Sequence, residues 1–93
     1  MVVGILTSSL LIPGSESLKD RRRVTKSLCD RIRSRFNVSC ADVSDHELWQ
    51  RATLAVACVN TDRQFAERIL NQIMDLIDAQ GDAEIANTEI EFV

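Results

Sequence analysis

The stretch Gln50–Val59, QRATLAVACV, decides the fold of this chain. Neighbouring side chains of an extended strand point to opposite faces of a sheet, so the stretch divides into two alternating sets. Both sets are apolar: the first is Leu54, Val56 and Cys58, and the second is Ala55, Ala57 and Val59. A strand that is apolar on both faces is typical of the centre of a covered sheet. The sequence therefore predicts a central strand, with other elements packed around it.

Two helical segments flank this strand in the sequence. Ser17-Leu18-Lys19-Asp20 matches a capping box and predicts a helix that runs to about Phe36, while Thr61-Asp62-Arg63-Gln64 predicts a second helix. Gly81 is a natural C-terminal stop for the second helix. Each helix carries an apolar stripe at 100° per residue, so each needs a surface to cover. The stripes are Leu18, Val24, Leu28, Ile32 and Phe36 in the first helix, with Thr25 and Cys29 between them, and Phe65, Ile69, Ile73, Leu76 and Ile77 in the second.

Three further strands complete the pattern. Val2–Ile12 is aliphatic and ends at Pro13-Gly14, Asn37–Ser44 follows the first helix, and Glu84–Val93 closes the chain. The order βαββαβ is that of a ferredoxin-like α+β sandwich, a four-stranded antiparallel sheet with two helices on one face. Residues 1–93 have the length of a single domain. The opposite face of the sheet is then left without a helix.

Composition narrows the functional classes. No apolar run approaches the length of a membrane span, and the first residues lack the basic, apolar pattern of a signal peptide, so we expect a cytoplasmic protein without membrane contact. Cys29, Cys40 and Cys58 form no CxxC pair and fit buried, reduced thiols. His46 is the only histidine, which is a poor basis for a metal site. We therefore expect neither metal nor cofactor.

Charge is divided unevenly along the chain. The overall net charge is −3, but residues 18–36 hold eight cations against two carboxylates, a net +6, and the remainder holds three cations against twelve carboxylates, a net −9. Such a division predicts one cationic face, and cations beside a helix N-terminus suit phosphate groups. The candidate phosphate- or RNA-binding residues are Lys19, Arg21, Arg22, Arg23, Lys26 and Arg33. The alternative is a solvated basic face paired with the many acids of the domain.

Arg21 has a second interpretation. By helical angle it lies within the apolar arc of the first helix, so its aliphatic stem could rest over the edge of the sheet.

Three segments together carry a resemblance to a known family. They are Ser17–Arg22 (SLKDRR), Arg35–Ser39 (RFNVS) and Asp45–Thr53 (DHELWQRAT), and with them nearly the whole chain resembles the bacterial YlxP-like family. That family is classed as a domain of unknown function, and its genes often stand beside genes for translation initiation and small-subunit maturation. The resemblance implies a ferredoxin-like fold and a ribosome-linked role. It implies no catalytic residues.

The leading hypothesis is a non-enzymatic protein that contacts RNA phosphates, on a ribosomal particle, through the first helix. A sheet that stacks RNA bases would carry aromatic residues on its open face, and the strands predicted at Val2–Ile12 and Gln50–Val59 have none. One alternative is a small phosphate-handling enzyme of acylphosphatase type, with Arg21 and Arg22 as clamps, although the Pro13–Ser17 loop lacks the arginine that such a site uses.

A homodimer formed through the bare sheet face or a sheet edge is the third hypothesis, because a small domain gains from covering an apolar face. Trp49 and His46 are the interface candidates.

Overall fold

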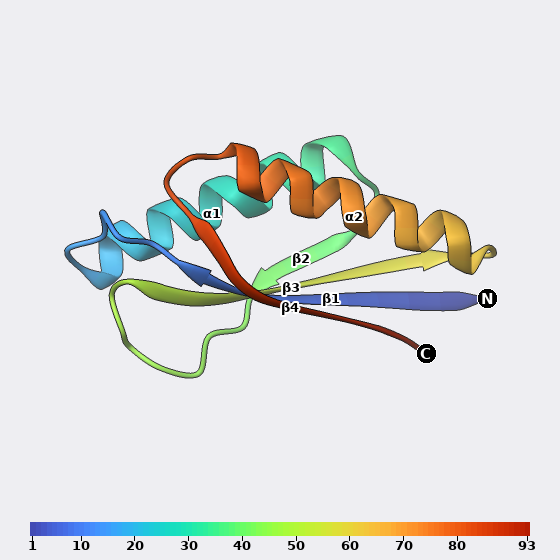
Figure 1. Ribbon diagram of the computed structural model, residues 1–93, viewed down its shortest axis with the longest axis horizontal. Helices are drawn as coiled ribbons and strands as arrows, with labels where there is room; N and C mark the ends of the chain where they lie inside the picture. Colours follow the sequence, from blue (N-terminus) through green and yellow to red (C-terminus); the bar gives the residue numbers. More distant parts are fainter.

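The predicted order of elements is confirmed. The computed structural model describes residues 1–93 as β1 (Val2–Leu11), α1 (Leu18–Arg35), β2 (Ser39–Asp42), β3 (Arg51–Asn60), α2 (Arg63–Ala79) and β4 (Glu84–Phe92). The strands form one antiparallel sheet in the order β2-β3-β1-β4, and both helices lie on the same side of it (Figure 1). This is the ferredoxin-like α+β arrangement. Neither helix is long and apolar enough to cross a membrane.

The register settles which face of β3 is covered. Leu54, Val56 and Cys58 point toward the helices and are at most 1% exposed, so they belong to the core. The other set faces the open side, where Ala55 and Ala57 are partly exposed and Val59 is exposed. In this register Ala57 pairs with Ile5 of β1 and with Ser39 of β2. The open face is thus apolar at its centre.

The open face changes character toward its borders. Ile5 and Thr7 of β1 lie opposite Glu91 and Glu89 of β4, so carboxylates line one side. Thr7, Ser9 and Thr53 add hydroxyl groups, and no aromatic side chain lies among them. The expectation of a bare face is confirmed, but that face is only partly apolar.

The first cap forms nearly as predicted and the second shifts by one residue. The Ser17 hydroxyl accepts from the Asp20 amide at 3.0 Å, while the Asp20 carboxylate accepts from the Glu16 amide at 3.0 Å. Before α2, the capping residue is Asp62 rather than Thr61, and its carboxylate accepts from the Gln64 amide at 2.9 Å. A carboxylate at this position also interacts favourably with the positive end of the helix dipole.

The predicted apolar stripe of α2 was wrong at Phe65. The ring is 46% exposed, whereas the neighbouring Ala66 is fully buried. The side of α2 that faces the sheet starts at Ala66 and continues at spacings of three and four residues. The buried residues are Ala66, Leu70, Ile73, Leu76 and Ile77. Phe65 lies one position off this line, with the Arg68 guanidinium 6.0 Å from its ring centre.

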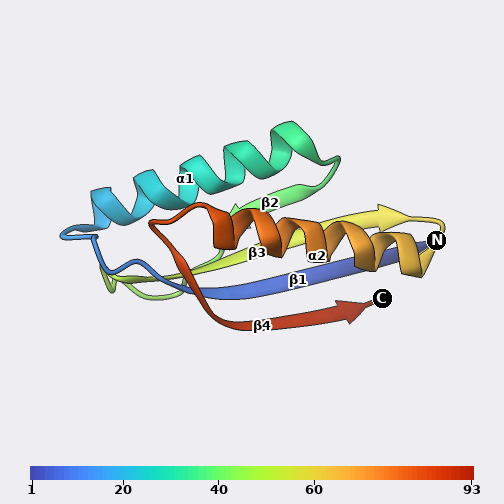
Figure 2. The ribbon, with the colours of Figure 1, turned by 45° about the horizontal axis from the view of Figure 1, so that its top comes forward.

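The second strand is shorter than the predicted Asn37–Ser44. The Asp42 carboxylate accepts from the amide of Ser44 at 2.9 Å and from its hydroxyl at 2.6 Å, which turns the backbone out of the strand. β2 therefore remains a four-residue edge strand beneath α1, while α2 lies over the central strands β1 and β3 (Figure 2).

Candidate functional site

The outward side of α1 is a continuous row of cations. We call the exposed cations on this side the basic stripe. They are those that lie within about 60° of Lys26 around the helix axis, at 100° per residue. Its members are Lys19, Arg22, Arg23, Lys26 and Arg33. From first to last they span about 21 Å of helix at 1.5 Å per residue. Five of the six predicted phosphate-binding residues are thus brought together.

Two carboxylates pair with part of this stripe. Asp30 lies 2.9 Å from Lys26 and 3.0 Å from Arg33, and Asp20 lies 4.0 Å from Arg23. The hydrogen bonds from Lys26 and then Arg33 lower the pKa of Asp30. These pairs are solvent-exposed, so each contributes little to folding and is open to exchange with other anions. The Arg22 guanidinium makes no ion pair or hydrogen bond within the protein.

Arg21 is separated from the stripe and buried. It is 5% exposed, and its Nη1 donates to the backbone carbonyl oxygens of Leu48 at 2.8 Å, His46 at 3.1 Å and Arg51 at 3.4 Å. Its stem lies within the covered side of α1, as the helical angle predicts. The guanidinium supplies donors to two loop carbonyls, those of His46 and Leu48, and to the first residue of β3, so the structure gives this arginine a structural task.

The loop of residues 43–50 is held from two sides. Gln50 Nε2 donates to the carbonyls of Pro13 and Ser15, both at 3.2 Å, and His46 Nδ1 accepts from the Leu48 amide at 3.2 Å. The loop projects past the plane of the sheet on the side opposite the helices (Figure 1). Trp49 remains 55% exposed on this anchored loop, while His46 is partly buried.

The segments that carried the family resemblance are therefore neighbours in space. Arg21 comes from the SLKDRR segment, and its acceptors come from the DHELWQRAT segment. A helical period can place the stem of Arg21, but it cannot name acceptors 25 to 30 residues away.

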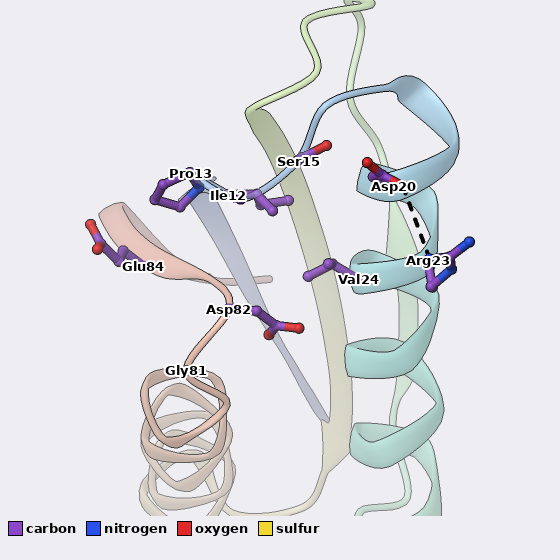
Figure 3. Close-up of a pocket in the computed structure, with 10 residues that line it drawn as sticks. Ile12, Pro13, Ser15, Asp20, Arg23, Val24, Gly81, Asp82 and Glu84 are labelled. Atoms are coloured by element: carbon purple, nitrogen blue, oxygen red, sulfur yellow. Dashed lines mark ion pairs between the residues drawn. The ribbon is translucent and has the colours of Figure 1, made fainter.

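The largest cavity lies elsewhere and has the wrong charge for phosphate. It measures about 570 Å³ and lies between the β1–α1 turn and the α2–β4 turn (Figure 3). Asp20, Asp82 and Glu84 line it against a single cation, Arg23. Its electrostatics thus oppose an anionic substrate at the turn that an acylphosphatase-type site would use.

An acylphosphatase-type site also uses an asparagine, for which Asn37 would have to lie beside Arg22, but Arg22 is near the start of α1 and Asn37 follows its C-terminal end. Fifteen residues of sequence, most of them helical, place them about 20 Å apart. The pair is therefore not assembled around one substrate.

A second, smaller hollow was missed at the level of sequence. It measures about 430 Å³, lies between α1 and β2, and holds Arg22, Lys26 and Arg33 on its helix side. Cys29 and Cys40 border it, and their sulfur atoms are 3.1 Å apart. The sequence indicated only that each thiol faces the core, because the meeting of a helix and a strand is a tertiary feature.

Comparison with known proteins agrees with this fold and assigns no chemistry. Residues 3–90 match the family described as "Protein of unknown function (DUF503)". The chain is 29% identical over 91 residues to the "Uncharacterized protein YlxP" of Bacillus subtilis (strain 168), covering 98% of this chain and 99% of that protein. Among solved structures, the "De novo designed protein Foldit4" superposes with a TM-score of 0.57 at 14% identity, covering 100% of this chain and 97% of that one, which is a likeness of fold alone. With a family match that spans almost every residue, the chain belongs to the DUF503 family and is similar to YlxP, as the three sequence segments indicated.

Proposed function

We propose that this protein binds the phosphate backbone of RNA through the basic stripe of α1, as a non-enzymatic cytoplasmic protein. The ribosome-linked role implied by the family resemblance makes a ribosomal particle the expected partner. The observation that carries the proposal is the concentration of a net +6 on one helix of a domain whose remainder is −9. Such a dipolar protein orients its cationic side toward a polyanion.

Two features of the stripe and one of the sheet support contact with the phosphate backbone. The stripe is linear and about 21 Å long, which suits a row of phosphates better than a single small anion. Arg22 has no internal partner, and the exposed pairs of Asp20 and Asp30 can be exchanged for phosphate at little cost. The open face of the sheet offers no aromatic ring for stacking, so recognition through the backbone is favoured over recognition of bases.

The test is a titration of structured RNA and of small ribosomal subunits at two salt concentrations. Binding by the unaltered protein should weaken with salt at a slope that reflects about three to six phosphate contacts. The triple variant Arg22→Glu, Arg23→Glu, Lys26→Glu should lose binding while remaining folded, because all three side chains are exposed.

The matched control reverses three exposed arginines elsewhere, Arg51→Glu, Arg63→Glu and Arg68→Glu, and so changes the net charge by the same amount. It should keep most of the affinity. An equal loss of RNA affinity in both triple variants would show that net charge alone causes the effect. Unchanged affinity in the stripe variant would contradict the proposal.

We also propose that two copies of the chain associate through the open face of the sheet. The apolar centre of that face is formed by Ile5, Ala41, Ala55 and Ala57, which border a shallow hollow of about 250 Å³. A second copy placed across a two-fold axis would cover this centre and leave the β4 carboxylates at the rim.

Sedimentation at micromolar concentration should give a dimer mass, and Ala57→Glu should give a monomer. Asn71→Glu, on the exposed side of α2, is the control and should remain dimeric. A monomer mass that does not change with concentration would contradict association.

A further inference from the structure

The hollow between α1 and β2 combines two thiols with a set of cations. Cys29 comes from the covered side of α1 and Cys40 from the edge strand β2. Both residues are less than a tenth exposed, yet both border a hollow of about 430 Å³ that opens to the surface. Arg33 lies on its helix side and donates through Nη1 to the Cys40 carbonyl at 2.6 Å, which fixes a positive charge beside the thiols.

The two sulfur atoms are already in contact. The Cys40 thiol donates to Cys29 Sγ at 3.1 Å, and a disulfide bond of about 2.05 Å would require the sulfurs to approach by roughly 1 Å. Rotation of the two side chains with a small shift of the short edge strand can supply that distance. Cys58 is 1% exposed on the central strand, pairs with neither thiol and does not border the hollow.

The two thiols are not equivalent. The hydrogen bond from Cys40 lowers the pKa of Cys29 in spite of burial, and the charge of Arg33 acts in the same direction. The same hydrogen bond, together with burial, raises the pKa of Cys40. Burial alone raises the pKa of Cys58. Of the two thiols, Cys29 is therefore the one that forms the reactive thiolate more readily, and the Cys40 sulfur lies 3.1 Å from it.

We propose that Cys29 and Cys40 form a redox-active dithiol that is oxidised by peroxides to a disulfide joining α1 to β2. The Cys29 thiolate attacks one oxygen of hydrogen peroxide, the O–O bond breaks, and the departing hydroxide takes up a proton to become water. Cys29 is then a sulfenic acid. Cys40 loses its proton and attacks the Cys29 sulfur, the S–O bond breaks, and a second water leaves. Overall, two thiols and one peroxide give one disulfide and two waters.

The small size of the oxidant matters in this geometry. Cys29 and Cys40 are less than a tenth exposed, so a small peroxide can reach the Cys29 sulfur more readily than a bulky disulfide or the thiol of another protein. The product would tie the edge strand to the helix that bears the basic stripe. The inference does not depend on RNA binding, because its reactants are the two thiols and a peroxide.

The sequence makes the test direct, since trypsin places each cysteine in its own peptide. These are residues 27–31 with Cys29, residues 36–51 with Cys40 and residues 52–63 with Cys58. The folded full-length protein is treated with one equivalent of hydrogen peroxide, blocked with an alkylating agent and digested without reductant. We expect a mass loss of two hydrogen atoms, a cross-linked pair of the first two peptides, and an unoxidised third peptide. Dithiothreitol should reverse the change.

Variants assign the roles of the two thiols. In Cys40→Ser, dimedone should trap a sulfenic acid on Cys29, because the responding thiol is gone. In Cys29→Ser, oxidation of Cys40 should be much slower. Arg33→Gln should slow the oxidation of Cys29 about threefold, because it removes a positive charge that favours the Cys29 thiolate. Arg68→Gln, an exposed arginine of α2, is the matched control and should leave the rate unchanged.

The buried Cys58 serves as an internal check on folding in every sample, because an unfolded variant would expose it to the alkylating agent. A cross-link between two chains, oxidation of Cys58 at the rate of Cys29, or a sulfinic acid on Cys29 without a disulfide would each overturn the proposal.

Discussion

The two helices cover the same face of one sheet, but they bury different kinds of side chain against it. The covered side of α2 is purely aliphatic and lies over the central strands β1 and β3. The covered side of α1 lies over β2, the edge strand, and combines Leu28, Cys29 and Ile32 with the polar Arg21 and Thr25. We refer to these two regions as the central half and the edge half.

The difference follows from what each helix meets. Central strands have their backbone groups paired on both sides, so only apolar contact remains to be made by α2. Beside α1 the sheet ends in a short strand and a loop, whose carbonyls need donors, and Arg21 supplies them. The comparison teaches that a cation on a covered helix face need not form a binding site, because here Arg21 completes the edge of a sheet.

The largest expected effect is in the central half. Ile73→Ala removes a fully buried side chain from α2 and should lower the free energy of unfolding by about 3 to 4 kcal/mol, the usual cost of such a cavity. Urea denaturation measures it. Gln72→Ala, on the exposed side of the same turn, should change stability by less than about 0.5 kcal/mol. A loss below 1 kcal/mol at Ile73 would mean that the central half is loosely packed.

The next effect is in the edge half. Arg21→Met keeps most of the buried stem but removes the donor to three carbonyls, so we expect a loss of about 2 to 3 kcal/mol. Trp49 is the only tryptophan and lies on the loop that Arg21 holds, so its fluorescence should become more accessible to acrylamide. Arg22→Met alters an exposed neighbour and should change neither quantity. Equal behaviour of the two variants would remove the distinction between a structural and a surface arginine.

A smaller change in stability, of opposite sign, is expected at Ser8. Its side chain is the one polar group beneath the central half that has no hydrogen-bond partner. The Ser8 hydroxyl on β1 is buried, at 1% exposure, and makes no hydrogen bond. Ser8→Ala should therefore raise the free energy of unfolding by about 1 kcal/mol, because the cost of an unpaired polar group disappears. Ser9→Ala, one residue along on the open face, is the control and should not stabilise. Destabilisation by Ser8→Ala would reveal a bond that the hydroxyl makes in solution.

The smallest effect concerns acid sensitivity in the edge half. Burial opposes ionisation of Asp42, but the hydrogen bonds from the hydroxyl and amide of Ser44 outweigh it and lower the pKa. A carboxyl whose pKa is lower when folded contributes stability above its ordinary pKa of about 3.9, and this is lost as the pH falls through the folded value.

Asp42→Asn should accordingly cost at most about 0.5 kcal/mol at neutral pH, because the side chain is largely solvated. The difference from the unaltered protein should shrink below pH 4. Denaturation at pH 7 and pH 3 provides the comparison, and a difference that grows in acid would reverse the assigned sign.

Local patterns in the sequence predicted the order of elements, because each helix, strand and cap depends mainly on residues that are close together in the chain. The alternation in Gln50–Val59, the cap at Ser17 and the Gly81 stop each rest on a few adjacent residues. The same holds for the basic stripe, since five of its cations recur at helical spacing. The failures at Thr61 and Phe65 are also local: the cap lies one residue later, at Asp62, and Phe65 lies at the border of the helical arc that faces the sheet.

Only the tertiary structure decided what depends on distant partners. The sequence could not choose which set of β3 faces the helices, because both are apolar and register alone separates them. The helical angle placed the stem of Arg21 in the apolar arc, but the sequence could not place its guanidinium, because the loop carbonyls that hold it lie 25 to 30 residues further along. Nor could it join Cys29 to Cys40, whose contact exists only once α1 packs over β2. Composition and period fix which elements form, whereas packing determines which side chains of those elements meet.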